Sequence, residues 1–365
     1  MTMESLTSAL AETIPWMQSR AEELDREAAF PRDEIDILRR LGALEPPLAA
    51  QASAGDGNEA DQLAAMLSLI GQGNLSVGRI FEAHVNALHL IARHGSITQW
   101  HAAMAAIQDG GLFALWVTDP PDDKLRMNRI GNRITLTGGK QFCSGAGYAT
   151  DVLVTAQDTD GGVRMLVLRL GIGETVRALP SPLQGMRAAV TGAVDFTGCE
   201  TPASGVLGQA GDYLREPDFS AGAWRGSAVA LGGLIALLDL AVAELQAAGR
   251  AGSPHAQARL GYAMIARETA RLWVGAAART AEDPNAETGR RVATVSLARI
   301  AVETACLDAM RLLQRSVGLS AFRQGNPIER ICRDLSTYLR QPAPDEVLTE
   351  AARWFMDHPK VLEAE

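Results

Sequence analysis

Apolar residues in the first 110 positions recur at the three- and four-residue spacing of amphipathic helices. The first such stripe consists of Leu6, Leu10, Met17, Ala21 and Leu24. A second stripe stops at Gly42, and glycine is typical of the position just after a helix. The segment Ser96-Ile97-Thr98-Gln99 has the pattern of a capping box, which predicts the start of another helix. We therefore expect an all-helical N-terminal domain over residues 1–110.

From Leu112 the pattern changes to short apolar runs separated by turn residues. Residues 133–137 alternate apolar and polar side chains with a period of two, as in a half-buried strand. Apolar runs at 151–155 and 163–170 are joined through Asp160-Gly161-Gly162, which is typical of a β-hairpin. Several short strands at close spacing favour one antiparallel β-domain or small barrel over residues 111–212.

After Asp212 the helical pattern returns in longer segments. Long helices are predicted at 228–247, 261–282 and 290–316, and a shorter one at 345–355. Their short polar connections imply antiparallel neighbours, so we expect a four-helix bundle over residues 213–365. This α+β order of helices, strands and helices favours separate domains over a doubly wound sheet. In addition, no Gly-x-Gly-x-x-Gly follows a strand, so a Rossmann dinucleotide site is not predicted.

Composition narrows the classes of function. A net charge of -9 and dispersed Lys and Arg residues argue against nucleic-acid binding. The most apolar stretch, residues 228–242, is short for a membrane span and contains Asp239, so it predicts a buried helix. The 4 cysteines form no Cys-x-x-Cys pair, and the N-terminus lacks the apolar core of a signal peptide. We therefore expect free thiols and a cytoplasmic protein.

His84, His89 and His94 recur every five residues on one predicted helix. Five residues turn a helix by about 140° beyond a full turn, so the three imidazoles point in different directions. This spacing predicts no metal site.

Two loops of the predicted β-domain combine an aromatic side chain with a hydroxyl. One is Trp116-Val117-Thr118 and the other is Phe142-Cys143-Ser144. A flavin ring needs a flat apolar wall and hydrogen-bond donors at its polar edge. An aromatic residue at a strand end is more often part of the core, so this pattern alone leaves both interpretations open.

Motifs spread over nearly the whole chain resemble the acyl-CoA dehydrogenase family. Residues 116–120 resemble its aliphatic-Thr-Glu-Pro loop, and residues 136–144 resemble its Leu-x-Gly-x-Lys-x-Trp-Ile-Thr/Ser segment. Residues 185–188 resemble Gly-Met-Arg-x, residues 314–318 resemble the Gln-x-x-Gly-Gly turn, and residues 329–334 match Glu-Arg-x-x-Arg-Asp. Each match is modest, but their order and spacing are specific.

The resemblance implies an FAD-dependent oxidoreductase that acts on an acyl thioester or a related small molecule. It also implies a homodimer or homotetramer and a redox partner, either an electron-transfer flavoprotein or a flavin reductase. In such a protein the turn at 314–318 serves the FAD of the partner subunit. The residues that the resemblance assigns to the cofactor are Trp116, Val117, Thr118, Phe142, Ser144, Arg250, Gln314 and Gly318.

The chain departs from the family at the catalytic base. Gln341-Pro342-Ala343-Pro344 stands where the family has Tyr-Glu-Gly-Thr, so Pro342 occupies the place of the catalytic Glu. Some members take the base from the first bundle helix beside an Arg, and here that pair is Trp224 and Arg225. The catalytic residue is therefore unknown. Asp345 and Glu346 are candidates, although acidic residues in a first helical turn commonly stabilise the helix end.

Three functions follow from this departure. The protein is a dehydrogenase that uses another base, a flavin-dependent monooxygenase with the same fold, or a catalytically inactive flavin-binding relative. The segment Pro121-Asp122-Asp123-Lys124 also replaces an acidic Gly-Ser-Asp that helps the family hold its cofactor.

Overall fold

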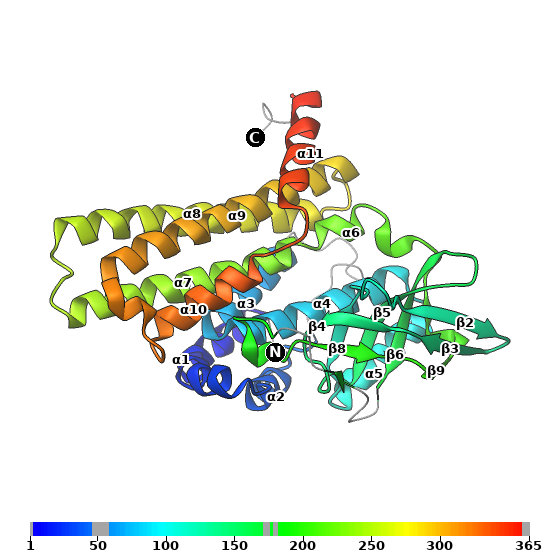
Figure 1. Cartoon of the computed structure of the whole chain (residues 1–365). Coiled ribbons are helices and arrows are strands. Elements are labelled where there is room, and N and C mark those ends of the chain that lie inside the picture. Colours follow the sequence, from blue (N-terminus) through cyan, green and yellow to red (C-terminus); the bar gives the residue numbers. More distant parts are fainter. Residues whose placement is uncertain (1–2, 46–57, 171–175, 178–181, 360–365) are drawn as a thin grey trace.

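The computed structural model describes residues 3–45, 58–170, 176–177 and 182–359. Helices, then strands, then helices follow one another along the chain (Figure 1). The N-terminal helices are α1 (Met3–Glu27), α2 (Arg32–Arg40), α3 (Asn58–Gly73), α4 (Leu75–His94) and α5 (Ile97–Gln108). The predicted capping box is present at the start of α5, where Ser96 and Gln99 exchange hydrogen bonds. Gly42 follows α2 with a φ of +76°, in the left-handed region that favours glycine. The prediction of helices in this part of the chain is confirmed for the described residues.

The middle of the chain forms two sheets. The strands are β1 (Phe113–Trp116), β2 (Arg126–Ile130), β3 (Arg133–Thr137), β4 (Gly139–Cys143), β5 (Asp151–Gln157), β6 (Val163–Arg169), β7 (Val176–Arg177), β8 (Gly192–Asp195), β9 (Glu200–Pro202) and β10 (Val206–Leu207). The larger sheet has the order β10-β6-β5-β2-β3-β9 with β1 also paired to β5, and the smaller has the order β4-β8-β7. β5 and β6 form the predicted hairpin. The β-domain is thus confirmed with one refinement: β1 runs parallel to β5, so the larger sheet is mixed.

The C-terminal helices are α6 (Asp218–Ala221), α7 (Trp224–Ala247), α8 (Pro254–Glu282), α9 (Thr288–Val317), α10 (Pro327–Tyr338) and α11 (Pro344–Asp357). The predicted bundle is confirmed, but its fourth helix is α10, which packs against α7. The helix predicted at 345–355 is α11, which packs on α9 and stands out from the body of the molecule (Figure 1). The pattern hid α10 because Arg330 and Asp334, which read as solvent-facing residues, are buried.

The N-terminal and C-terminal helices share one core, whereas the β-domain has its own. α3 and α7 cross at very short range because both carry glycine at the contact. A Cβ atom at Gly232 would lie 2.0 Å from the Ser68 carbonyl oxygen, and one at Gly71 would lie 2.3 Å from that of Val229. The crossing fixes α7 against the N-terminal helix α3.

One helical segment of the described chain, Asp218–Ala247, is long and apolar enough to cross a membrane by length and composition. However, 67% of its most apolar window is buried inside the molecule. This agrees with the core helix predicted around residues 228–242.

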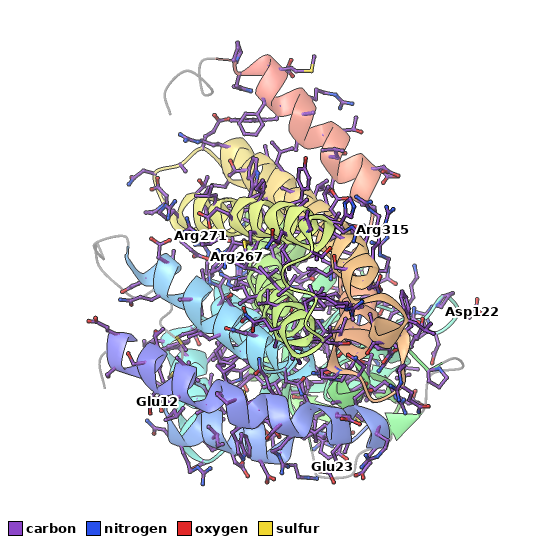
Figure 2. All side chains as sticks on the ribbon, turned by 90° about the vertical axis from the view of Figure 1, so that its left-hand side faces the viewer. Glu12, Glu23, Asp122, Arg267, Arg271 and Arg315 are labelled. Carbon is purple, nitrogen blue, oxygen red and sulfur yellow. The ribbon has the colours of Figure 1, made fainter. Side chains whose placement is uncertain are left out.

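An end-on view of the bundle shows how charge is distributed over its outside (Figure 2). Glu12 and Glu23 lie along α1 at one side, and Arg267 and Arg271 lie on α8, away from α1. Asp122, in the loop that departs from the family, projects from the edge of the molecule.

Candidate functional site

The two candidate loops of the β-domain lie side by side and are joined by a buried lysine. The ammonium of Lys140 donates to the Val117 carbonyl oxygen at 3.1 Å, to Asp119 at 2.5 Å and to the Thr155 hydroxyl at 3.0 Å. The backbone N–H of Gln141 donates to the Thr118 carbonyl oxygen at 2.9 Å. Burial lowers the pKa of Lys140, and the contact with Asp119 opposes that shift. Lys140 therefore fixes the positions of both loops rather than facing solvent.

Trp116 lies in the core of the β-domain. Its ring is buried and lies 6.4 Å from that of Phe196, centroid to centroid. Its indole N–H donates to the Ser144 carbonyl oxygen at 2.9 Å. The Trp116 ring is therefore not available as a flat wall for a cofactor, but the hydrogen bond positions Ser144 in the neighbouring loop.

Phe142 is the aromatic residue that the site exposes. It lies in a β-bulge of β4, where the pairing with β8 shifts register between Lys140 and Cys143. Its φ is +56°, an unfavourable value for a residue with a side chain, and 50% of the residue is exposed. Strained, exposed residues of this kind concentrate at binding sites. Next to it, Thr118 is exposed, and its hydroxyl has no hydrogen-bond partner among the described residues.

These residues fit the ring of a flavin at this end of the β-domain. Phe142 offers an aromatic face, Thr118 offers an uncommitted hydroxyl, and the buried Ser144 hydroxyl is only loosely paired with Thr191, at 3.5 Å. The assignment of Val117, Thr118, Phe142 and Ser144 to the cofactor remains a prediction.

The residues predicted to hold the adenylate half of FAD lie elsewhere. The guanidinium of Arg250 donates to the Val317 carbonyl oxygen at 2.8 Å, which brings it beside the turn containing Gln314 and Gly318. Figure 1 shows that turn at the end of the bundle farthest from the β-domain. The turn and the β-domain therefore lie at opposite ends of the chain in this view.

The connection between α10 and α11 carries no acidic side chain. Pro342 accepts a hydrogen bond at its carbonyl oxygen from Arg299, and Ala343 adopts a left-handed φ of +49° before α11 begins. Asp345 and Glu346 are exposed in the first turn of α11. The structure thus supplies no contact that would bring either of them inward.

The alternative base position on the first bundle helix is also without a free carboxylate. Trp224 is fully buried, and its indole N–H donates to Glu282 at 3.1 Å. Arg225 donates to Glu282 at 2.6 Å, to His89 at 3.2 Å and to Asn86 at 2.9 Å. Burial alone would raise the pKa of Glu282, but the charge of Arg225 holds it below its usual value. Glu282 is therefore committed to balancing Arg225.

A cavity of about 70 Å³ lies directly beside the α10–α11 connection. Its walls include Glu82 of α4, Gly226 of α7, Arg299 and Glu303 of α9, Tyr338 of α10 and Gln341. The sequence interpretation missed Glu82, because a single Glu in an amphipathic helix usually faces solvent. No sequence signal marked it, because Arg79, His84 and Asn86 are also polar and lie within four residues of it.

The three histidines of α4 have separate structural roles. His84 accepts from the Phe113 backbone N–H at 3.0 Å and donates to the Leu44 carbonyl oxygen at 2.8 Å. Burial lowers the pKa of His84 to about 4 and that of His89 to about 3, so both are neutral at physiological pH. His94 lies near Asp212 and Asp218. Among the described residues no cluster of His, Cys, Asp or Glu could hold a metal ion.

Two of the family-like motifs contact each other. The Met186 backbone N–H donates to Asp334 at 2.6 Å, and the Gly185 backbone N–H donates to Thr337 at 3.1 Å. A Cβ atom at Gly185 would lie 2.4 Å from the Arg333 carbonyl oxygen, so only glycine fits there. These contacts fix α10, and with it Tyr338, against the loop that contains Gly185 and Met186.

Comparisons with known proteins agree with these motifs. Residues 228–340 match the family model described as acyl-CoA dehydrogenase, C-terminal domain. Cyclohex-1-ene-1-carbonyl-CoA dehydrogenase of Geobacter metallireducens is 27% identical over 338 residues, which cover 86% of this chain and 87% of that protein. Acryloyl-CoA reductase (NADH) of Anaerotignum propionicum is 24% identical over 205 residues, which cover 52% of each chain.

Solved structures of two different enzymes superpose equally well. Butyryl-CoA dehydrogenase from Megasphaera elsdenii gives a TM-score of 0.84 at 18% identity, covering 97% of this chain and 98% of that one. Dibenzothiophene monooxygenase from Paenibacillus sp. A11-2 gives a TM-score of 0.84 at 18% identity, covering 97% of both chains. The fold is shared with both proteins, so the fold does not choose between their reactions.

Proposed function

Because the chain belongs to the acyl-CoA dehydrogenase superfamily, we propose that it is a flavin-dependent oxidoreductase whose reaction does not use the carboxylate base of that family. The observation that carries this proposal is that the α10–α11 connection has no acidic side chain, and the resemblance assigns Pro342 in it to the place of the catalytic Glu. The substrate is a small molecule, either an acyl-CoA thioester or a related compound.

The missing base decides between the reactions. A flavin, when bound, supplies two-electron oxidation or reduction. Dehydrogenation of a saturated thioester also needs a base that removes the proton on the carbon next to the carbonyl. Such a base contributes roughly 10²–10⁴-fold to the rate. Trp224, Arg225 and Pro342 cannot accept that proton, and Asp345 and Glu346 are exposed. Oxygenation of a substrate, as performed by monooxygenases with this fold, places no such demand on the protein.

The residues of this chain would position the cofactor and shield the reaction. Lys140 holds the Val117–Asp119 loop against the strand that carries Phe142 and Ser144. Thr118 and Ser144 would hydrogen-bond to the polar edge of the flavin ring, and Phe142 would cover part of its surface. We propose FAD rather than FMN, because Arg250 and the turn from Gln314 to Gly318 resemble family segments that hold the adenylate half, and Arg250 donates to the Val317 carbonyl oxygen of that turn.

We further propose a homodimer or a dimer of dimers. The turn at 314–318 lies at the end of the bundle away from the β-domain (Figure 1), so in this proposal it serves the cofactor of a second copy. Near that turn Leu319 and Phe322 are exposed, and the outer face of α8 exposes Tyr262, Ile265 and Leu272. Apolar side chains gathered in this way are typical of subunit interfaces.

Spectroscopy of the purified protein tests the proposed function. We expect a yellow protein, or one that becomes yellow with added FAD, whose visible band persists when butyryl-CoA is mixed in under anaerobic conditions. With NADH, a flavin reductase and oxygen, a monooxygenase consumes oxygen in proportion to oxidised substrate. Rapid bleaching by butyryl-CoA would refute the loss of the base. A protein that stays colourless in excess FAD would refute the flavin assignment.

A further inference from the structure

The cavity beside the α10–α11 connection combines polar side chains with apolar wall residues, which include Ala230, Val302 and Leu339. Glu82 is buried, and its Oε2 accepts from the Tyr338 hydroxyl at 2.8 Å and from Arg79 at 2.7 Å. Its Oε1 accepts from the Asn86 side chain at 3.1 Å. On the opposite side, Arg299 lines the same cavity and bonds to the Pro342 carbonyl oxygen.

Glu82 has acceptor capacity left over. A carboxylate offers about four acceptor positions on its two oxygens, and the described donors occupy three of them. The remaining position belongs to Oε1, the oxygen nearer to Gly226: a Cβ atom there would lie 3.6 Å from Oε1 and 3.3 Å from the Tyr338 hydroxyl. Because residue 226 is glycine, the space in front of these oxygens stays open.

We propose that this cavity is the specificity pocket of the enzyme and that Glu82 Oε1 accepts a hydrogen bond from a hydroxyl or amino group of the substrate. This inference rests on the proposed function, because it takes the α10–α11 connection to be where substrate binds. The compound that fits is a small hydroxylated or aminated molecule, in contrast to one with a plain alkyl chain.

Two physical arguments support this choice. An alkyl group in the cavity would remove water from Glu82 and return no hydrogen bond, and an unsatisfied buried acceptor is costly. A hydroxyl or amine would satisfy the remaining acceptor position. The volume of about 70 Å³ exceeds the roughly 10–15 Å³ that one water molecule needs, so the cavity admits a small polar group.

Calorimetric titration of the flavin-bound protein tests the pocket with two matched pairs of probes. One pair is 3-hydroxybutyryl-CoA against butyryl-CoA, and the other is benzyl alcohol against toluene. A site built around a hydrogen bond to a charged group discriminates by roughly tenfold or more. We expect the hydroxylated member of at least one pair to bind at least about tenfold more tightly.

Three variants assign the preference to the cavity. Gly226→Ala adds one methyl group in front of Glu82 and Tyr338 and leaves every polar group in place, so it should abolish the preference. Gly261→Ala is the matched control, because a Cβ atom at this helical position of α8 meets nothing within 4 Å, and it should bind like wild type. Glu82→Gln removes the charge and should reduce the preference, and if that variant fails to fold, Gly226→Ala still decides.

The outcomes separate this inference from the proposed function. Equal binding within each pair, or no binding of the hydroxylated probes, by the flavin-bound protein would overturn the pocket alone. A preference that survives Gly226→Ala would also overturn it. A preference shown by protein that cannot hold flavin, and lost in Gly226→Ala, would support the pocket and refute the proposed function.

Discussion

At the glycine crossing of α3 and α7, the structure predicts that adding a methyl group destabilises the protein. In Gly232→Ala the added Cβ atom would lie 2.0 Å from the Ser68 carbonyl oxygen, 2.6 Å from the Gln72 nitrogen and 2.9 Å from the Gly71 carbonyl carbon. All three are backbone atoms, so no side-chain rotation relieves the overlap. Ordinary contact begins at 3.4 Å, so the two helices must separate by more than 1 Å.

Two opposing contributions set the change in the free energy of unfolding of Gly232→Ala. Alanine is favoured over glycine inside a helix by about 1 kcal/mol. Forcing extra volume into a packed contact costs about 1–3 kcal/mol, and a rigid backbone neighbour places this case at the upper end. We therefore expect Gly232→Ala to lower the free energy of unfolding by about 2 kcal/mol, measured by urea denaturation followed by far-UV circular dichroism.

The control for this substitution lies on α8. Gly261→Ala has the same helical benefit and meets no atom within 4 Å, so it should leave stability unchanged or raise it by up to about 1 kcal/mol. The double variant Gly71→Ala/Gly232→Ala should cost less than the sum of its parts, because the first methyl group already separates the helices. If Gly232→Ala were as stable as Gly261→Ala, the close crossing would be wrong.

Three further predictions concern the candidate site and the assembly. Pro342→Glu should raise the rate of flavin reduction by butyryl-CoA by less than about tenfold, because Arg299 and the left-handed Ala343 fix the turn. A positioned base would raise that rate by roughly 10²–10⁴-fold, so rapid anaerobic bleaching of the variant would contradict this prediction. Burial raises the pKa of Asp334 to about 6 from an ordinary 3.8, despite Arg330, so the folded protein binds the extra proton and loses stability as the pH rises from about 4 to 6. The free energy of unfolding of Asp334→Asn, measured with urea, should therefore rise relative to that of wild type by up to about 3 kcal/mol between pH 4 and pH 7. If the difference between the two free energies did not change with pH, titration of Asp334 would be ruled out. Light scattering should show a dimer or tetramer at micromolar concentration, and Ile265→Glu/Leu272→Glu should weaken any interface on α8; a wild-type monomer would refute the assembly.

The fold could be predicted from the sequence where the determinants are local. The capping box at Ser96 and Gln99, the glycine turn between β5 and β6, and the long apolar stripes of α7 and α9 each act over a few residues. α10 escaped prediction because its identity depends on partners far along the chain. Arg333 pairs with Asp25 of α1, and Asp334 accepts from Met186, so its charged residues face inward.

Only the β-domain loops of the candidate site could be proposed from the sequence, because short motifs mark them. The two loops of the β-domain are linked by the side chains of Lys140 and Trp116. Both residues belong to motifs that carry the family resemblance. The cavity could not be predicted, because it is assembled from α4, α7, α9 and α10 and no motif marks it. Glu82 and Tyr338 meet at 2.8 Å although they are 256 residues apart in sequence.

The lost base and the polar cavity are physically consistent with each other. A carboxylate that abstracts a proton needs a free lone pair aimed at the reacting carbon and a place that the substrate can reach. Two carboxylates line the cavity and both are paired: Arg79, Tyr338 and Asn86 occupy most acceptor positions of Glu82, and Glu303 accepts from Arg340. Such a group recognises a donor better than it removes a proton from carbon. The resemblance places a rigid proline turn where the family has its base, with a buried carboxylate next to it, and we expect this arrangement to hold a polar substrate for a reaction that needs no proton abstraction from carbon.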